Sequence, residues 1–210
     1  DRQRRIAQTT PNRAEEALPD AGFVFACFNN LYKLTPEVFD IWVRLLQQVP
    51  QSVLWLLSEN GAVNDRLRVR AQEQGVTTDR LVFASRKPLD QHLARHRLAD
   101  LFLDTLPYNA HTTASDALWT GLPVLTCQGS SFASRVAASL LRAAGMPELV
   151  TYSLPEYEAR ALALAQTPNE LAALRERLIL QGRQSPLFDT PRFARHMEAA
   201  YRMKIGRASC

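Results

Sequence analysis

Short apolar runs alternate with amphipathic segments through the first 151 residues of the chain. The apolar runs lie at 23–28, 52–57, 81–84, 101–103, 123–126 and 149–151. Each run is typical of a buried strand, and helical segments separate the runs. We therefore expect an α/β fold, a Rossmann-like doubly wound parallel sheet with helices on both faces.

The segment after the first run carries the signals of a helix start and a helix stop. Thr35 is a candidate N-cap, Pro36 suits the first turn, and Glu37 places an acid at the positive end of the helix. Pro50 stops this helix, and Gly75 is a natural C-cap for the next one. These local signals support the alternation of strands and helices.

The pattern changes after residue 152. Amphipathic segments at 155–165, 169–181 and 191–203 follow one another without a strand. The predicted organisation is a connector at 1–21, a nucleotide-binding domain at 22–151, a helical tail at 152–204 that packs on it, and an end at 205–210 that we interpret as non-native. The chain opens on a polar stretch without Met, so we interpret it as part of a longer protein.

Composition and charge narrow the class of partner. The chain has 210 residues, of which 46% are hydrophobic, and this is enough for a buried core. Its net charge is +4, its basic residues are nearly all Arg, and no dense basic run follows Arg5. We expect a solvated surface and no nucleic-acid partner, whereas an anionic small ligand is compatible with this balance.

Cysteine usage and hydropathy bear on the compartment. Cys27 and Cys127 each close an apolar run, so we expect both to be buried and reduced. No apolar run approaches the roughly 18 residues of a membrane span, and no signal peptide is recognisable. The expected location is the cytoplasm, with no membrane contact.

The most informative stretch is the loop and helix start after the run at 101–103. Thr112 and Thr113 stand at the expected helix start, and Asp116 lies one turn further on. Unpaired N–H groups and the positive end of a helix suit phosphate, and a carboxylate can accept hydrogen bonds from ribose. The sequence thus predicts a nucleotide site without a glycine-rich loop. The alternatives are that the two Thr only cap the helix and that Asp116 only complements its dipole.

Other loops should bring polar residues to the same edge, because ligands of such sheets bind beside the carboxyl ends of the strands. In this interpretation Lys33 offsets phosphate charge and His92 lies flat on a base. The further candidates on these loops are Asn30, Lys87, Arg95 and His111. Plainer alternatives stay open: a solvated Lys33, a surface charge at Arg95, and a satisfied loop histidine at His111.

Several other kinds of site are not indicated. His92 and His96 are four residues apart, but no His-Glu-x-x-His pattern accompanies them, so we expect no zinc site. The chain has no Gly-x-Ser-x-Gly elbow and no Walker loop. No glycine triplet follows Phe28, which argues against dinucleotide redox chemistry.

Three motifs closely resemble the O-linked N-acetylglucosamine (O-GlcNAc) transferase family. They are FNNLYK at 28–33, NAHTT at 109–113 and FASRVAAS at 132–139. The shorter segments 52–57, 98–100 and 185–188 agree in the same order, and the resemblance extends from about residue 9 to 203. An Arg- and Ala-rich composition suggests a bacterial member.

The resemblance implies the carboxy-terminal half of a GT-B glycosyltransferase, a fold of two Rossmann-like domains that tetratricopeptide repeats usually precede. It implies that Lys33 contacts the diphosphate and stabilises the leaving UDP, and that His92 packs on uracil with Arg95 nearby. The remaining donor-binding residues implied are His111, Thr112, Thr113 and Asp116, the last at ribose. Asn30 stands where animal members have Gln, and Leu89 where Lys is common, so Lys87 is the candidate replacement.

The implied reaction is inverting transfer of N-acetylglucosamine from UDP-GlcNAc to a Ser or Thr hydroxyl of a protein. No cofactor or metal is expected, because a lysine and helix N–H groups can hold the departing charge. The general base and much of the acceptor groove belong to the amino-terminal half, so this chain alone is expected to be inactive. The alternatives are another GT-B glycosyltransferase or a sugar-nucleotide epimerase, and a non-catalytic nucleotide-binding module.

Overall fold

The core of the protein is a parallel β-sheet. The computed structural model describes residues 2–58 and 60–208, and its six strands are β1 (Val24–Cys27), β2 (Val53–Leu57), β3 (Leu81–Ala84), β4 (Leu101–Leu103), β5 (Val124–Cys127) and β6 (Val150–Thr151). Their order is β3-β2-β1-β4-β5-β6, and every pair is parallel. The expected Rossmann-like doubly wound sheet is confirmed. Its order reverses between β1 and β4, where such sheets bind ligands.

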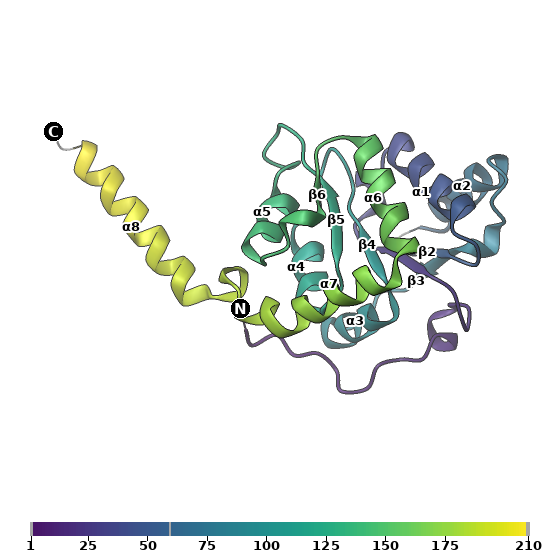
Figure 1. Ribbon diagram of the computed structural model, residues 1–210, viewed down its shortest axis with the longest axis horizontal. Helices are drawn as coiled ribbons and strands as arrows, with labels where there is room; N and C mark the ends of the chain where they lie inside the picture. Colours follow the sequence, from purple (N-terminus) through teal and green to yellow (C-terminus); the bar gives the residue numbers. More distant parts are fainter. Residues whose placement is uncertain (1, 59, 209–210) are drawn as a thin grey trace.

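Helices cover the sheet. They are α1 (Pro36–Gln48), α2 (Gly61–Glu73), α3 (Leu89–Arg95), α4 (Thr112–Thr120), α5 (Val136–Ala143) and α6 (Leu154–Gln166). Helix α1 packs against α6, whereas α4 packs against both α3 and α5 (Figure 1). Because the strands are covered, all residues of β1, β2, β4 and β5 are buried.

The helix ends follow the local signals of the sequence. Thr35 is the N-cap of α1, and its side chain accepts a hydrogen bond from Val38 N at 3.4 Å. Gly121 ends α4 with a φ of 85°, a left-handed conformation that favours glycine. A Cβ on Gly121 would also come within 2.7 Å of Ile179 Cγ1, so a side chain there would have to displace this isoleucine.

Two helices after β6 pack on the domain, as expected. Tyr157 of α6 accepts a hydrogen bond from Trp42 Nε1 of α1 at 3.1 Å and donates one to the Asp104 carbonyl at 3.1 Å. Helix α7 (Pro168–Gln181) buries Leu171, Leu174 and Leu178. These two helices therefore belong to the globular body.

Helix α8 (Thr190–Ala208) extends away from the body (Figure 1). Residues 190–203 are all exposed, so α8 departs from the packing expected of the whole helical tail. Three of its apolar side chains, Phe193, Met197 and Tyr201, recur every four residues and are exposed. The predicted non-native end at 205–210 lies in the helix up to Ala208, and its last two residues are outside the described residues.

The connector crosses the surface in a largely extended conformation, with one short 3-10 turn at Ala14–Glu16. Ala7 N donates to the Asp90 carbonyl at 3.0 Å, and Trp119 Nε1 donates to the Arg4 carbonyl at 3.2 Å. Near its start Arg2 forms an ion pair with Asp189 at 3.8 Å, just before α8. The chain therefore enters and leaves the domain at neighbouring points (Figure 1).

Candidate functional site

The residues predicted for the site lie on three loop–helix segments at the carboxyl edge of the sheet. One cavity there, of about 300 Å³, is lined by Phe28, Asn30, Leu57, Arg86, Lys87, Leu89, His92, Arg95 and Thr113. It joins the segments that follow β1, β3 and β4. Five predicted residues meet in it: Asn30, Lys87, His92, Arg95 and Thr113. The other four, Lys33, His111, Thr112 and Asp116, lie outside its lining.

His92 is held in the wall of this cavity by Arg95. The Arg95 Nε donates to His92 Nδ1 at 3.0 Å, and Phe28 packs edge-on against the ring with centroids 5.1 Å apart. Because arginine only donates, Nδ1 must accept, which leaves the ring proton on Nε2. Burial and the Arg95 charge lower the pKa of His92 to about 4, so the ring is neutral at pH 7.

Arg95 itself is fully buried, so the interpretation of it as a surface charge is wrong. Its Nη1 donates to the Ser85 carbonyl at 2.7 Å, and its guanidinium lies 5.1 Å from the Phe28 ring centroid. A buried guanidinium with these fixed partners makes a rigid support for the histidine ring.

Lys33 is partly buried and has defined partners, unlike a freely solvated lysine. Its Nζ donates to the Asn109 carbonyl at 3.2 Å and stands 4.0 Å from the centroid of the Tyr108 ring. Burial lowers the pKa of Lys33, and the nearby Asp104 opposes that shift. The ammonium is thus directed to the loop that leads into α4.

The start of α4 has no side-chain cap. His111 occupies the N-cap position and caps no N–H, while the Thr113 hydroxyl donates to Asn29 Oδ1. The interpretation of Thr112 and Thr113 as caps is therefore wrong. His111 stacks on Tyr108 with centroids 5.2 Å apart, and its buried Nε2 has no hydrogen-bond partner among the described residues. Such an end can bind an anion through its backbone.

Asp116 is buried and pairs with Arg4 of the connector. Burial raises the pKa of the Asp116 carboxyl, and the Arg4 charge opposes that shift. No acidic residue stands in the first turn of α4, so Asp116 does not simply complement the helix dipole. Arg4 could not be identified as a site residue from any local pattern, because the pair joins positions 112 residues apart.

Lys87 and Asn30 differ in how firmly they are held. The Lys87 Nζ lies 2.5 Å from Oε1 of the buried Glu16, a second charged residue of the connector. Asn30 is partly exposed at the N-cap of the short 3-10 turn Leu31–Lys33, without a side-chain cap bond. Leu89 is more than half exposed at the rim of the cavity.

Asp104, which the sequence analysis did not assign, organises the loop between β4 and α4. Its carboxylate accepts hydrogen bonds from Thr105 N at 2.8 Å, Ala110 N at 2.6 Å and the Thr126 hydroxyl at 2.6 Å. Burial raises the pKa of Asp104 to about 7, against the opposing effect of these donors. The sequence pattern that could have identified Asp104 is an acidic residue directly after an apolar strand.

The part of the chain that the structure describes, residues 2–58 and 60–208, offers no candidate metal centre and no candidate membrane span. Within that part of the chain no three His, Cys, Asp or Glu residues are grouped so as to hold a metal ion. The helices of the same part include none with the length and apolar character to cross a membrane.

Sequence comparison connects this chain with known proteins. Residues 2–197 match the family described as glycosyl transferase family 41. A probable UDP-N-acetylglucosamine–peptide N-acetylglucosaminyltransferase of Arabidopsis thaliana, SEC, is 41% identical over 192 residues, which are 91% of this chain and 20% of that protein. The corresponding Caenorhabditis elegans protein is 40% identical over 89% of this chain and 16% of its own length. The chain thus spans about a fifth of these curated relatives.

Structure comparison agrees with the sequence. An O-GlcNAc transferase variant of Thermobaculum terrenum aligns with a TM-score of 0.82 and 38% identity, over 87% of this chain and 36% of that one. WaaG, a glycosyltransferase involved in lipopolysaccharide biosynthesis, aligns over 90% of this chain and 52% of its own with a TM-score of 0.65. At 18% identity the second match shows the fold alone. The expected resemblance and the GT-B half are confirmed.

Replacing Asp104 by Ala should destabilise the domain. The change leaves the buried N–H groups of Thr105 and Ala110 without their acceptor, at about 1–3 kcal/mol each. The free energy of unfolding, measured with urea, should fall by about 2–5 kcal/mol. Asp104→Asn keeps one oxygen that can accept from these N–H groups, so its free energy of unfolding should fall less. Equal stability of the Ala variant and the wild type would contradict the role of Asp104.

The pH dependence of stability should also change at Asp104. The folded pKa of about 7 lies above the ordinary unfolded value of about 3.9, so the folded state binds more protons between these values. Wild-type stability should therefore fall as pH rises from about 4 through 7, relative to that of Asp104→Asn. Parallel curves for the two proteins would show that this carboxyl does not titrate in that window.

Proposed function

Because the chain belongs to glycosyl transferase family 41, we propose that it forms the UDP-binding half of an inverting glycosyltransferase. The enzyme would transfer N-acetylglucosamine from UDP-GlcNAc to Ser or Thr hydroxyls of proteins. The observation that carries the proposal is the junction of three segments at the sheet's switch point. There the neutral ring of His92 lines the same cavity as Thr113, which lies at the start of α4, a helix without a side-chain cap.

Each part of the site fits one part of a uridine diphosphate. The His92 ring is suited to stack on a base, and Asn30, Lys87 and Arg95 offer polar groups around it. The N–H groups at Thr112 and Thr113 suit the diphosphate, and they follow His111, whose Nε2 has no hydrogen-bond partner among the described residues. The list of proposed donor-binding residues is completed by Lys33 and Asp116.

In the proposed reaction the acceptor oxygen attacks the anomeric carbon from the face opposite the UDP. The bond from that carbon to the β-phosphate oxygen breaks, and its electron pair leaves with UDP. Lys33 and the N–H groups of α4 stabilise this developing charge, so the proposal needs no metal or other cofactor. The proton of the acceptor hydroxyl goes to a base outside this chain.

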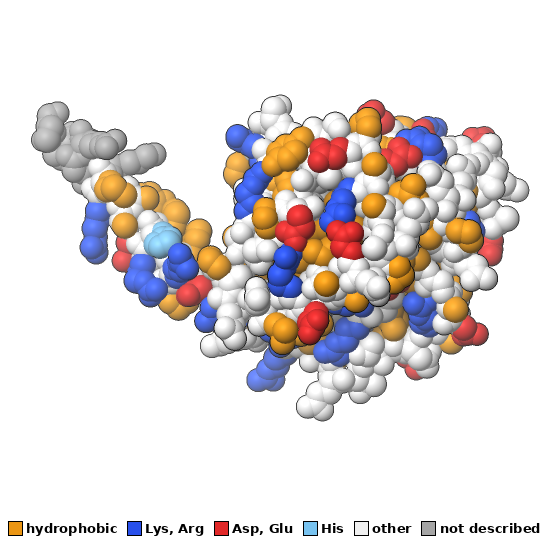
Figure 2. All heavy atoms as spheres, viewed as in Figure 1, with side chains coloured by type: hydrophobic (Ala, Val, Ile, Leu, Met, Phe, Trp, Pro, Cys, Tyr) orange, Lys and Arg blue, Asp and Glu red, His pale blue; other side chains and the backbone are white. Residues whose placement is uncertain are grey.

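We propose that the partner supplying this base is an amino-terminal half of the same protein. Helix α8 supports this: Phe193, Met197 and Tyr201 are 63%, 39% and 59% exposed and recur every four residues. Figure 2 shows apolar side chains along one edge of α8 and basic side chains along the other. A stripe at this spacing fits packing against another folded surface. Without that half the chain should bind nucleotide but not catalyse transfer.

The proposed compartment is the cytoplasm. Cys27 and Cys127 are both free and buried, as is usual for proteins of a reducing compartment.

A titration with nucleotides tests the proposed donor. UDP should bind more tightly than ADP or GDP if the proposed donor is correct, because uracil is then the base that packs on His92. Isothermal titration calorimetry on the protein containing this chain measures the three affinities. Equal affinities would favour a module without base selectivity, and tight ADP or GDP binding would indicate another donor.

Lys33→Ala should affect turnover more than binding. The ammonium acts mainly on the charge of departing UDP, so turnover at saturating UDP-GlcNAc should fall by roughly 100-fold or more. The dissociation constant for UDP should change much less. Unchanged turnover at saturating donor would refute the proposed role.

Asp116→Ala should reduce the preference for ribose. Loss of a carboxylate that accepts ribose hydroxyls should weaken UDP binding by about 1.5–3 kcal/mol and narrow the gap between UDP and deoxy-UDP. Arg4→Ala is the matched control, because it removes the ion pair but keeps the carboxylate. An unchanged ratio of UDP to deoxy-UDP affinity in Asp116→Ala would make Asp116 a structural residue.

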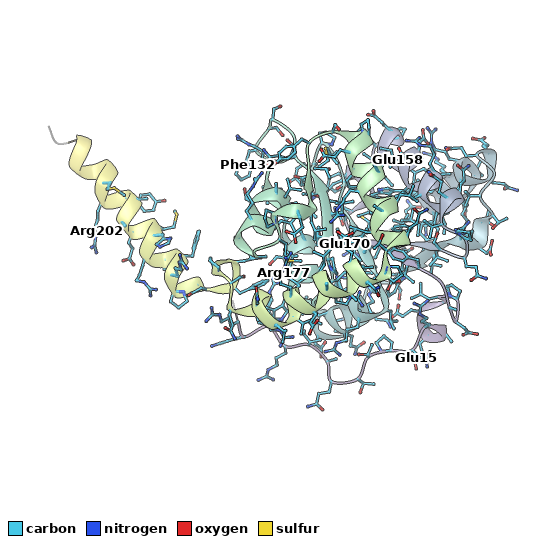
Figure 3. All side chains as sticks on the ribbon, in the orientation of Figure 1. Glu15, Phe132, Glu158, Glu170, Arg177 and Arg202 are labelled. Atoms are coloured by element: carbon cyan, nitrogen blue, oxygen red, sulfur yellow. The ribbon has the colours of Figure 1, made fainter. Side chains whose placement is uncertain are left out.

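The stripe on α8 can be tested in the complete enzyme. Met197→Glu places a charge among apolar residues and should lower the thermal unfolding temperature if another domain covers this face. Arg202→Gln, on the same helix (Figure 3), is the control, because it also changes the charge by −1. If the two variants lose equal stability, the stripe is not a packing surface.

A further inference from the structure

Glu16 is a buried carboxylate that the proposed mechanism does not use. It lies on the connector, in the short 3-10 turn, and only 3% of its side chain is exposed. Its Oε1 is 2.5 Å from Lys87 Nζ, and its Oε2 is 3.6 Å from Arg95 Nη1. One carboxylate from outside the sheet domain thus pairs with two cations that line the candidate cavity.

The contact with Arg95 leads directly to the base-binding wall. A fully buried guanidinium is costly unless a negative charge and hydrogen-bond acceptors surround it. Glu16 supplies the charge, while the Ser85 carbonyl and His92 Nδ1 accept from the guanidinium. Glu16, Arg95 and His92 therefore form one chain of contacts that ends at the imidazole ring.

We propose that Glu16 is a positioning residue for the donor nucleotide: by holding Arg95 against His92 it fixes the tautomer and orientation of the ring that packs on the base. The inference rests on the proposed function, since it assumes a nucleotide in the cavity. Glu16 need not touch that nucleotide. Its connection to Lys87 fixes a cation at the rim of the same cavity.

The tautomer of His92 indicates whether Arg95 keeps its contact with the ring. Arg95 and Arg86 both disfavour its protonation, and His96 Nδ1 contacts the His92 carbonyl at 2.7 Å. The N–H groups of Arg95 require Nδ1 to be the acceptor, so the Nε2–H form should dominate. If Arg95 loses Glu16 and moves, that requirement ends and the Nδ1–H form becomes populated.

The test compares Glu16→Gln with Glu15→Gln in the protein containing this chain. Glu15 lies on the same turn (Figure 3), is exposed, and contacts Asn12, so its variant removes an equal charge without touching Arg95. Two quantities are measured: the UDP dissociation constant by calorimetry, and the His92 tautomer by NMR with 15N-labelled histidine.

We expect Glu16→Gln to weaken UDP binding about tenfold, the scale of coupling between charged neighbours in one network. The same variant should show mixed His92 tautomers, whereas Glu15→Gln should match the wild type in both measurements. Should Glu16→Gln fail to fold, Glu16→Asp withdraws the carboxylate by one methylene and should show the same changes at smaller size.

The outcomes separate this inference from the proposed function. Weaker UDP binding with an unchanged His92 tautomer would mean that Glu16 only anchors the connector, which overturns the inference. Unchanged UDP binding in Glu16→Gln, with normal binding by the wild type, would overturn it as well. If the wild type does not bind UDP but Glu16→Gln shifts the tautomer, the proposed function fails and the link from Glu16 to His92 stands.

Discussion

A buried carboxylate must have its oxygens occupied by hydrogen-bond donors, and the candidate site is built around the way Asp104 meets this constraint. Asp104 directly follows β4 and takes its donors from the loop that comes next and from Thr126 of β5. That loop presents the Asn109 carbonyl to Lys33 and leads into the uncapped start of α4. Asn29, at the end of β1, bridges the Thr105 and Thr113 hydroxyls. One polar cluster thus fixes the two segments on either side of the switch point.

Much of this architecture could be predicted from the sequence, because its determinants are local. All six strands lie within a residue or two of the expected apolar runs, and Thr35 is the N-cap of α1 as expected. The direction of α8 could not be predicted in the same way. Its amphipathic pattern indicates that one face packs against another surface, but it does not indicate which surface that is.

The predicted site residues lie at the expected edge of the sheet, but the charged partners of several of them were not predicted. Parallel strands bring their following loops together, so the meeting of Asn30, His92 and Thr113 follows from topology. The pairs Arg4–Asp116 and Glu16–Lys87 join the connector to residues 112 and 71 positions away, and no local pattern encodes such contacts. The connector therefore contributes charges to the site although its own sequence has no regular pattern.

The adjacent entry and exit of the chain have a mechanical consequence. Arg2, at the entry, pairs with Asp189, and it also donates to the Gln184 carbonyl at 3.1 Å, so entry and exit share one small area of surface. A domain that is connected to its neighbours at two adjacent points can rotate as a rigid body about a hinge through these points. Torsion changes in a few residues near 2 and 189 would then be enough to swing the whole sheet domain.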